Sequence, residues 1–459
     1  MHVPADTAAI HAAALRVLAT TGVAVLDDGT VRLLQAHGAR VDGRQVYIDE
    51  GAVQAALAAA PSGFTLAGRS PAREVQFGDG HTVFGSGSGP AYMLDGDRVR
   101  LGALADLEAT VKLGHLSTAI EYHGDSVEVL DLPAEQRTRR GTYARVTLSD
   151  KAFEPVAITD SDLDVAETVL EILAGAAWHE RPRGLVILNT SSPLQISGET
   201  ARILVRWARL GQPSCVTSCV MGGTTGPATL AGTLVVQHAE VLAALVLAQA
   251  AAEGSPFVYG GLSAMASLRT GAVHFGTPEF VLMAACTVQL AHLCGLPVRA
   301  GAAITDAHVP DAQAAEESCR GAGAAAQAGA DFVFQAAGLL SSFNVMSLEK
   351  FVLDDELLTA LRALEQPVSA TPDDLAEAVV AEVGPGGSYL GAGHTRAHVR
   401  DLDRPSWLVR DALEKWTADG AEDARQAATR EVQRRLEAFT PPDDLDDVVR
   451  RQLDEYLLA

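Results

Sequence analysis

Polar side chains gather directly after an apolar run in the second half of the chain. The run Leu296–Ile304 is interrupted only by Arg299 and predicts a buried strand. Asp306, His308 and Asp311 follow within seven residues of its end. Ligands of α/β proteins lie at such strand-to-helix turns, so two carboxylates and an imidazole there are placed to bind one. Turn formation and helix capping explain either aspartate alone equally well, and the interpretation depends on the elements around them.

A helix is expected after this turn, over residues 312–328. Asp311 suits its N-cap, because a side-chain oxygen at that position accepts a hydrogen bond from a free backbone N–H. Gln313 and Glu317 are four residues apart and therefore share one face of the helix. The stretch from Arg299 to Glu317 would then form one wall of a pocket.

Apolar runs alternate with amphipathic stretches through the middle of the chain. The expected strands cover residues 118–122, 156–159, 185–189, 214–220, 257–261, 297–304 and 332–336. The expected helices between and after them cover residues 162–174, 199–210, 230–252, 278–294, 312–328 and 348–361. This alternation over roughly 250 residues is typical of a (β/α)8 TIM barrel, with the eighth strand assumed. Such a barrel carries its site at the carboxyl ends of its strands.

The 459-residue chain divides by pattern into three regions. Residues 1–104 predict an N-terminal helical cap followed by β-hairpins, because D-G turns separate short alternating runs. Residues 105–370 predict the (β/α)8 barrel core. Residues 371–459 predict the barrel end and a C-terminal helical extension.

Small polar residues follow several of the expected strands. The segments Asn189–Leu194, Met221–Pro227, Gly260–Met265 and Thr305–His308 are rich in Gly, Ser and Thr. Each alone is ordinary turn chemistry, but the carboxyl ends of barrel strands meet at one mouth. Together they predict one shared and mostly neutral pocket.

Composition excludes some function classes. The formal net charge is −23, so the clustered Lys and Arg that nucleic-acid binding requires are missing. The longest apolar run, Leu230–Ala252, is broken by polar residues and predicts no membrane span, and the N-terminus has no signal-peptide pattern. A soluble cytoplasmic protein is expected.

Five cysteines without an export signal indicate a reducing compartment rather than a disulfide framework. Cys215 and Cys219 would share a strand face, so with a distant His they offer a zinc site as an alternative. Free cysteine is more often a small buried apolar residue, and no metal site is predicted.

Several motifs resemble those of the trimethylamine methyltransferase-like family, and they occur in the family's order over nearly the whole chain. They are H-A-A-A-L-R-V-L-A-T-T-G-V, N-T-S-S-P-L, M-G-G-T-T-G-P-A-T-L-A-G, H-A-E-V-L-A-A, G-S-P-F-V-Y-G, T-P-E-F, T-D-A-H-V-P-D-A-Q-A-A-E-E and G-A-G-H-T-R-A-H-V-R. The resemblance implies a corrinoid-dependent methyltransferase on a (β/α)8 barrel. No pyrrolysine occurs here, which favours the members thought to act on glycine betaine or a related betaine. His308 stands where the family usually has a Lys, which leaves the substrate open.

The implied reaction moves a methyl group from a quaternary amine to the Co(I) corrinoid (cobalamin) of a separate carrier protein. A corrinoid-binding D-x-H-x-x-G motif would need a Gly where Asp306-Ala-His308-Val-Pro-Asp311 has Asp311. The resemblance therefore implies a cofactor supplied by a partner protein and none bound tightly by this chain. The amine leaves uncharged, so positioning and desolvation matter more than an acid.

Such a site needs a cage for the cation and donors for a substrate carboxylate. Asp306, His308 and Glu317 are the expected catalytic group, with the two carboxylates facing the cation. The expected substrate-binding residues are Tyr92, Tyr259, Phe275, Gln313, Phe343, His394 and Arg269. The expected corrinoid-facing loops contain Asn189, Ser191, Gly222, Gly223 and Thr224.

Two other functions stay open. One is a non-catalytic betaine-binding or regulatory homologue that kept the pocket. The other is a zinc-dependent methyltransferase using Cys215, Cys219 and a His. A homo-oligomer is expected in each case.

Overall fold

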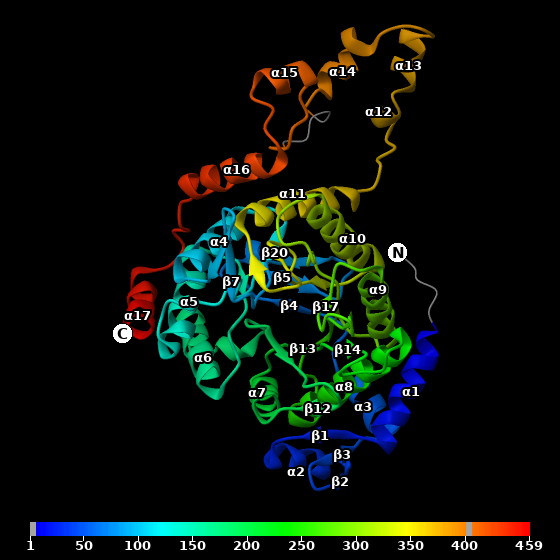
Figure 1. Ribbon diagram of the computed structural model, residues 1–459, viewed down its shortest axis with the longest axis vertical. Helices are drawn as coiled ribbons and strands as arrows, with labels where there is room; N and C mark the ends of the chain where they lie inside the picture. Colours follow the sequence, from blue (N-terminus) through cyan, green and yellow to red (C-terminus); the bar gives the residue numbers. More distant parts are fainter. Residues whose placement is uncertain (1–5, 401–405) are drawn as a thin grey trace.

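Eight parallel strands form the central sheet, each paired with its neighbour along the chain except at one seam (Figure 1). This is a computed structural model, and it describes residues 6–400 and 406–459. In chain order the strands are β6 (Val83–Gly85), β9 (Ile120–His123), β10 (Ala152–Phe153), β11 (Val186–Asn189), β13 (Ser214–Ser218), β15 (Phe257–Gly261), β18 (Val298–Arg299) and β19 (Phe332–Val333). The last strand, β19, pairs with the first, β6, and the ladder ends at β10 and β11. The fold is therefore a (β/α)8 barrel with one open seam, as the alternation predicted.

A helix follows each of the eight strands. They are α4 (Leu104–Leu116), α5 (Ala134–Leu148), α6 (Asp160–Ala174), α7 (Gly198–Arg209), α8 (Leu230–Ala251), α9 (Pro278–Leu293), α10 (Ala312–Ala328) and α11 (Leu348–Leu364). Six of them, α6 to α11, begin at a Ser, Thr or Asp N-cap whose side chain accepts a hydrogen bond from the first turn. The turns at the strand ends are thereby fixed.

Helix α8 is long and apolar enough to cross a membrane by length and composition alone. Most of its residues are buried, because it packs on the barrel strands and also against α1 (Thr7–Thr20), α3 (Glu50–Ala59) and α7. Burial on nearly all sides accounts for its apolar sequence.

The barrel strand that the sequence did not reveal is β6, the first in chain order. It lies in the region where only a helical cap and hairpins were expected. The barrel thus starts at Val83, before the expected boundary at residue 105. Only three residues long and followed by a Gly-rich segment, β6 resembles a hairpin arm in sequence. Its strand partners on both sides, β9 and β19, define it instead.

Two expected strands differ from prediction. The strand expected at residues 156–159 was wrong; the chain pairs at Ala152–Phe153, because Pro155 has no N–H to extend the ladder and Thr159 already caps α6. In the run 297–304 only Val298–Arg299 pairs, because Gly301 adopts a positive φ of 67° and turns the chain.

The N-terminal region packs around the barrel. A sheet of β12 (Gln195–Ile196), β1 (Val23–Val25), β3 (Gln45–Tyr47) and β2 (Arg40–Asp42) lies beside α1, α3 and α2 (Asp28–Ala36). The hairpin β4 (Phe64–Leu66) and β5 (Val75–Phe77) joins one apolar cluster with inward residues of the barrel strands. It therefore closes the amino-terminal end of the barrel.

Short strands form two small sheets at the carboxyl-terminal end of the barrel. One sheet contains β14 (Met221–Gly222), β16 (Ala264–Ala266) and β17 (Val273–His274). The other contains β20 (Leu339–Leu340), β21 (Val345–Met346), β7 (Tyr92–Asp95) and β8 (Arg98–Leu101). Both are built from segments that follow barrel strands, so they shape the mouth.

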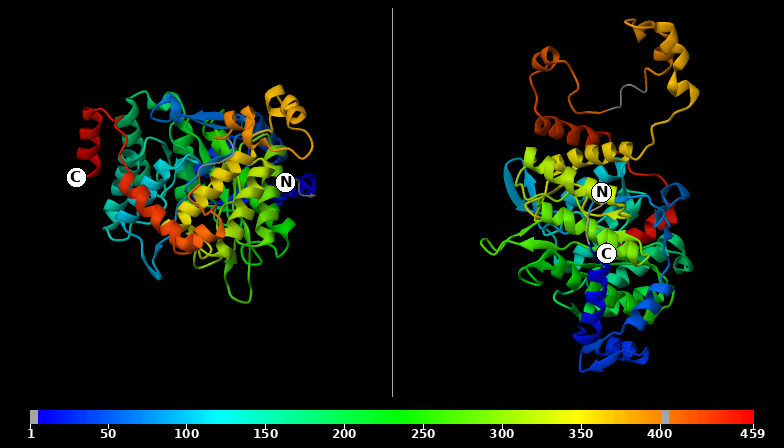
Figure 2. Two further views of the ribbon diagram at one scale, coloured as in Figure 1. Left: turned by 90° about the horizontal axis from the view of Figure 1, so that it is seen from above. Right: turned by 90° about the vertical axis from the view of Figure 1, so that its right-hand side faces the viewer.

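The C-terminal region leaves the barrel and returns to it. Helix α16 (Ala424–Ala438) packs on α11 and α4, and α17 (Asp447–Leu457) packs on α5 and α6. Between α11 and α16, four short helices project from the barrel as an arm (Figures 1 and 2): α12 (Pro372–Leu375), α13 (Glu377–Val383), α14 (Gly393–Ala397) and α15 (Leu413–Ala418). Helices α12 and α13 are separated at Ala376, which is left-handed with φ 49°. Whether the chain is an oligomer stays a prediction.

Candidate functional site

A cavity of about 840 Å³ lies at the carboxyl ends of the barrel strands. All eight strands, or the residues just after them, contribute to its wall. These contributions are Ser88 and Gly89 after β6, Asp125 after β9, Glu154 after β10, Asn189 on β11, Cys219 after β13, Leu262 after β15, Arg299 on β18 and Gln335 after β19. Ile158 also lines it and is 74% exposed, so the cavity opens to the surface. A shared pocket at the barrel mouth is present as predicted, but the expectation that it is mostly neutral was wrong, because Asp125, Glu154 and Arg299 are in its wall. Of the four expected segments, Asn189–Leu194 and Gly260–Met265 contribute to the wall, whereas Met221–Pro227 and Thr305–His308 do not.

Glu154 is a buried carboxyl group in this cavity. It is 8% exposed and accepts hydrogen bonds from the Asp125 N–H at 3.4 Å and from the Ser88 side chain. Burial, followed by the nearby charge of Asp125, raises the pKa of Glu154 to about 7, against the lowering effect of Arg145. No ion-pair partner of Glu154 occurs among the described residues. A cationic ligand is the natural partner for such a group.

Asp125, by contrast, is already neutralised. The guanidinium of Arg145, 1% exposed and carried by α5, donates a hydrogen bond to Asp125 in an ion pair. Thr142 on the same helix accepts a second hydrogen bond from Arg145 at 3.2 Å. This pair fixes the loop after β9 without leaving a free charge.

Arg299 is a buried positive charge in the cavity wall, which Arg137 and Arg139 of α5 also line. It is 1% exposed and donates one hydrogen bond from Nη2 to Oε1 of Gln335, while Nε and Nη1 have no hydrogen-bond partner among the described residues. Burial is the largest effect on its pKa and lowers it, while the thiols of Cys215 and Cys219 and the carboxyl group of Glu154 act to raise it. The ring of Phe334 lies 6.0 Å from the guanidinium.

Two aromatic side chains complete the wall. Phe275, 8% exposed, follows β17, and Phe343 follows β20. Both were among the expected cage residues, and both line the cavity. Phe343 has a positive φ of 80°, so its backbone is held in a conformation rare for a bulky residue.

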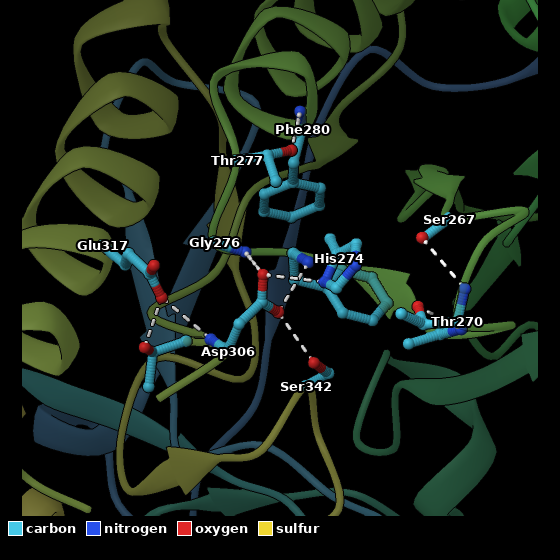
Figure 3. A network of polar contacts seen from close by, with 12 residues as sticks. Ser267, Thr270, His274, Gly276, Thr277, Phe280, Asp306, Glu317 and Ser342 are labelled. Atoms are coloured by element: carbon cyan, nitrogen blue, oxygen red, sulfur yellow. Dashed lines mark hydrogen bonds and ion pairs between the residues drawn. The ribbon is translucent and has the colours of Figure 1, made fainter. Parts of the chain in front are cut away.

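Asp306 connects the loop of Phe275 with the loop before Phe343. Figure 3 shows its carboxylate between Gly276, His274 and Ser342. Its carboxylate accepts hydrogen bonds from the N–H groups of Phe275 at 3.0 Å and Gly276 at 3.2 Å. It also accepts one from the Ser342 hydroxyl at 2.7 Å, and His274 lies 3.4 Å away. Asp306 lies behind the cavity wall rather than in it, so its contacts assign it to positioning Phe275 and the loop before Phe343.

Glu317 has a similar supporting place. It accepts hydrogen bonds from the Thr305 hydroxyl and from the Asp306 N–H at 2.8 Å (Figure 3). It also accepts one from the Gln313 side chain at 2.9 Å. Asp311 accepts a hydrogen bond from the Ala314 N–H at 3.1 Å, which confirms it as the N-cap of α10. Glu317 and Gln313 do not line the cavity.

The other expected binding residues lie outside the cavity wall. Tyr259 is buried on β15 with its hydroxyl 2.9 Å from Nδ1 of His238 on α8, so it points away from the barrel axis. His308 is exposed and lies 2.8 Å from the Ser341 hydroxyl. Tyr92 on β7 is 43% exposed, Arg269 is exposed between β16 and β17, and His394 lies in the arm, 3.0 Å from the Asp373 carbonyl.

The expected corrinoid-facing loops lie at the mouth. Asn189 lines the cavity, whereas the other four do not: Ser191 forms a β-bridge with Gln195, Gly222 ends β14, and Gly223 and Thr224 lie in the turn after it. Glu240 of α8, 1% exposed, holds the first of these loops. It accepts hydrogen bonds from the hydroxyls of Thr190, Ser192 and Ser218 and from the Leu194 N–H.

Cys215 and Cys219 do not form the alternative zinc site. Within residues 6–400 and 406–459, neither cysteine belongs to a group of three ligand-type side chains close enough to share an ion. Burial raises the pKa of the Cys215 thiol to about 11 and also raises the pKa of Cys219, which disfavours the thiolate that zinc requires.

Glu154 and Arg299 are the functional candidates that the sequence interpretation missed. Arg299 carried a signal, because it is the one charge in an apolar strand. Glu154 sits in the unremarkable segment K-A-F-E-P and showed none.

Comparisons with known proteins identify the family of the chain and agree with its fold. Residues 1–458 match the family described as Trimethylamine methyltransferase (MTTB). A glycine betaine methyltransferase of Desulfitobacterium hafniense is 34% identical over 454 residues, covering 98% of this chain and 94% of that protein. Trimethylamine methyltransferase MttB2 of Methanosarcina mazei is 30% identical over 450 residues, covering 95% and 91%.

The fold has relatives among solved structures. The monomethylamine methyltransferase MtmB of Methanosarcina barkeri superposes with a TM-score of 0.54 at 12% identity, covering 96% of this chain and 89% of that one. With no pyrrolysine in its sequence and a family match over its whole length, the chain belongs to the trimethylamine methyltransferase (MTTB) family as a non-pyrrolysine member.

Proposed function

We propose that the protein transfers a methyl group from a quaternary ammonium compound to the Co(I) corrinoid of a separate carrier protein. The observation that carries this proposal is the cavity at the barrel mouth, which combines a buried carboxyl group lacking a cation partner with two aromatic side chains. A carboxylate and aromatic faces are the groups that bind quaternary ammonium ions. Family membership supplies the reaction class, and the related betaine and trimethylamine enzymes act on methylated amines by name.

The proposed reaction requires little proton transfer by the protein. The methyl carbon exchanges its bond to nitrogen for a bond to cobalt; the C–N electron pair stays on nitrogen, and Co(I) supplies the pair for the new bond. The amine leaves uncharged, so no acid has to protonate it. Glu154, Phe275 and Phe343 hold the ammonium group and keep water away, which orients one methyl for in-line attack.

The acceptor would reach the methyl group through the mouth of the cavity. The opening past Ile158 connects the interior to the surface between the starts of α5 and α6. The segment from Asp306 to Asp311 has no Gly to complete a corrinoid-binding motif. A carrier protein that brings its corrinoid to the mouth fits both features.

Binding and transfer are measured separately. Calorimetry with glycine betaine, choline and tetramethylammonium tests for a cation site, and the absorbance of a reduced corrinoid carrier tests for substrate-dependent methylation. Glu154→Gln should weaken cation binding. Asp331→Asn is the matched control, because Asp331 is also a buried carboxyl group with a pKa raised by burial, but at the amino-terminal end of β19.

Each outcome is decisive. Cation binding followed by corrinoid methylation supports the proposal. Binding without methylation by any carrier supports the non-catalytic betaine-binding alternative. If no quaternary ammonium compound binds, the proposed function is refuted.

A further inference from the structure

We propose that Arg299 and Gln335 form a subsite for the carboxylate of the substrate, so that the cavity selects a zwitterionic betaine over a simple quaternary cation. This inference rests on the proposed function and adds the chemical class of its substrate. The expected catalytic and substrate-binding residues whose imidazole, guanidinium or amide groups could donate to a carboxylate do not line the cavity; they are His308, Arg269, Gln313 and His394.

Arg299 has unused hydrogen-bond donors in a place where water is scarce. The residue is 1% exposed, and its Nε and Nη1 atoms have no partner. No carboxylate forms an ion pair with Arg299 among the described residues. A buried charge without a partner is costly, and buried donors are nearly always satisfied. An anionic ligand group supplies both the charge and the acceptors.

Gln335 orients the guanidinium toward the cavity. Its Oε1 accepts a hydrogen bond from Nη2 of Arg299, which leaves Nε and Nη1 to donate elsewhere. Gln335 is itself held rigidly: its φ is 57°, and its carbonyl accepts a hydrogen bond from the Ala303 N–H at 3.0 Å. The two strands β18 and β19 thus carry a preorganised donor group. Guanidinium and carboxylate groups match in geometry as well as charge.

The cavity also holds the second charge that a zwitterion needs. Glu154 enters from β10 and Arg299 from β18, and they form no ion pair with each other at 4.0 Å or less. Glu154 and Arg299 are opposite charges in one cavity, and neither forms an ion pair with another side chain among the described residues. This arrangement suits a ligand with a cation at one end and an anion at the other. A betaine has this arrangement, while choline and tetramethylammonium would leave Arg299 unpaired.

How strongly the cavity prefers a betaine over an uncharged analogue depends on the unpaired hydrogen-bond donors of Arg299. A site built to hydrogen-bond a substrate group rejects an analogue that lacks it far more strongly than an apolar pocket does, by 10⁴-fold or more in the best cases. For one carboxylate we expect glycine betaine to bind about 100-fold more tightly than its uncharged carboxamide, which keeps the same size and the same ammonium group.

Calorimetry tests this inference with glycine betaine, its carboxamide and tetramethylammonium on the wild type, on Arg299→Met and on Arg183→Met. Arg183 is the matched control, a part-buried arginine whose Nε also lacks a partner but which lies outside this cavity. Arg299→Met should lose about 100-fold in betaine affinity and keep its affinity for tetramethylammonium. Arg183→Met should change neither.

Wild-type measurements keep the test valid even if Arg299→Met does not fold. Equal affinity of the wild type for glycine betaine and its carboxamide would overturn the subsite while leaving the proposed function intact. Equal loss of betaine and tetramethylammonium binding in folded Arg299→Met would also overturn it. Failure of all three ligands to bind the wild type would instead refute the proposed function and the subsite with it.

Discussion

The pH dependence of cation binding should report the protonation state of Glu154. Burial raises the pKa of this carboxyl group from its ordinary 4.5 to about 7, so below neutral pH most molecules carry an uncharged Glu154. A quaternary ammonium ion has no proton to lose, and the charge of a betaine is constant over this range. Affinity should therefore fall about tenfold for each pH unit below 7 and level off above it, because only the ionised fraction binds well.

Glu154→Gln removes both the charge and this pH dependence. Gln has nearly the same shape but cannot ionise, so its affinity for glycine betaine should be the same at pH 6 and pH 8. At pH 8 the loss relative to wild type should be about 3 kcal/mol, or about 100-fold, as expected when one partner of a buried charge pair is removed. The other charged groups facing Glu154 are Asp125 with its partner Arg145, and Arg299.

The same group should make the unliganded protein less stable as pH rises. Between pH 4.5 and about 7 the unfolded chain loses the Glu154 proton while the folded protein keeps it, so the free energy of unfolding falls across this window. The change from 4.5 to about 7 corresponds to about 3 kcal/mol at 1.36 kcal/mol for each pH unit. Below 4.5 the contribution is fully present, and above 7 it is lost.

Calorimetric titration with betaine and urea unfolding, each from pH 5 to pH 8.5, check both parts. Glu154→Gln should lack the sloping part of the stability profile that wild type shows, and Asp331→Asn should keep the wild-type pH profile of betaine binding. Unchanged wild-type affinity from pH 6 to pH 8, or wild-type affinity in Glu154→Gln at pH 8, would refute the assignment of Glu154 as the cation partner.

Three further changes separate positioning, packing and stability. Asp306→Asn should weaken betaine binding about tenfold by calorimetry, since it loses one of the acceptor oxygens that fix the Phe275 loop. Asp311→Asn, which keeps a capping side chain, should bind betaine normally. Weaker binding by Asp311→Asn than by Asp306→Asn would contradict the positioning role of Asp306. Phe343→Leu should cost about 1 kcal/mol of cation affinity while leaving the urea midpoint nearly unchanged, and unaltered binding would remove this ring from the cage. Lys151→Met should lower the free energy of unfolding by about 3 kcal/mol or more, because Nζ of this buried residue donates hydrogen bonds to three backbone carbonyls. The betaine affinity of the folded fraction should not change. If Lys151→Met is as stable as the wild type, those carbonyls find other donors.

The barrel was predictable from the sequence where its elements are long. Helices α8 and α10 are long and begin at a capping Thr or Asp, and their bounds agree with expectation to within a residue. Helix α5 is also long, but it has no side-chain N-cap and was not predicted. Strands β6 and β10 have only three and two residues. Their pairing depends on neighbours distant in sequence, so no local pattern marks them.

The candidate site was only partly predictable, because residue type alone does not say which way a strand residue points. Phe275 and Phe343 follow their strands and do line the cavity. Asp306 and Glu317 were expected to face the ligand, but their oxygens are used by neighbouring N–H and hydroxyl groups. Local hydrogen bonding of this kind is the ordinary use of acidic residues at turns.

Successive side chains of a barrel strand point to opposite faces. This explains why Tyr259 points away from the cavity, and it would have identified Arg299 as a residue that points into it. Tyr259 pairs in register with Val216 and Val298, and these three lie in the cluster that packs against the helices. The next residue along a strand points to the opposite face, so Arg299, directly after Val298, must point into the barrel. An arginine that points inward at the carboxyl end of a barrel strand meets the ligand cavity rather than solvent. Its charge then has to be matched from within the cavity, and because Glu154 forms no ion pair with it, the matching charge belongs to the substrate.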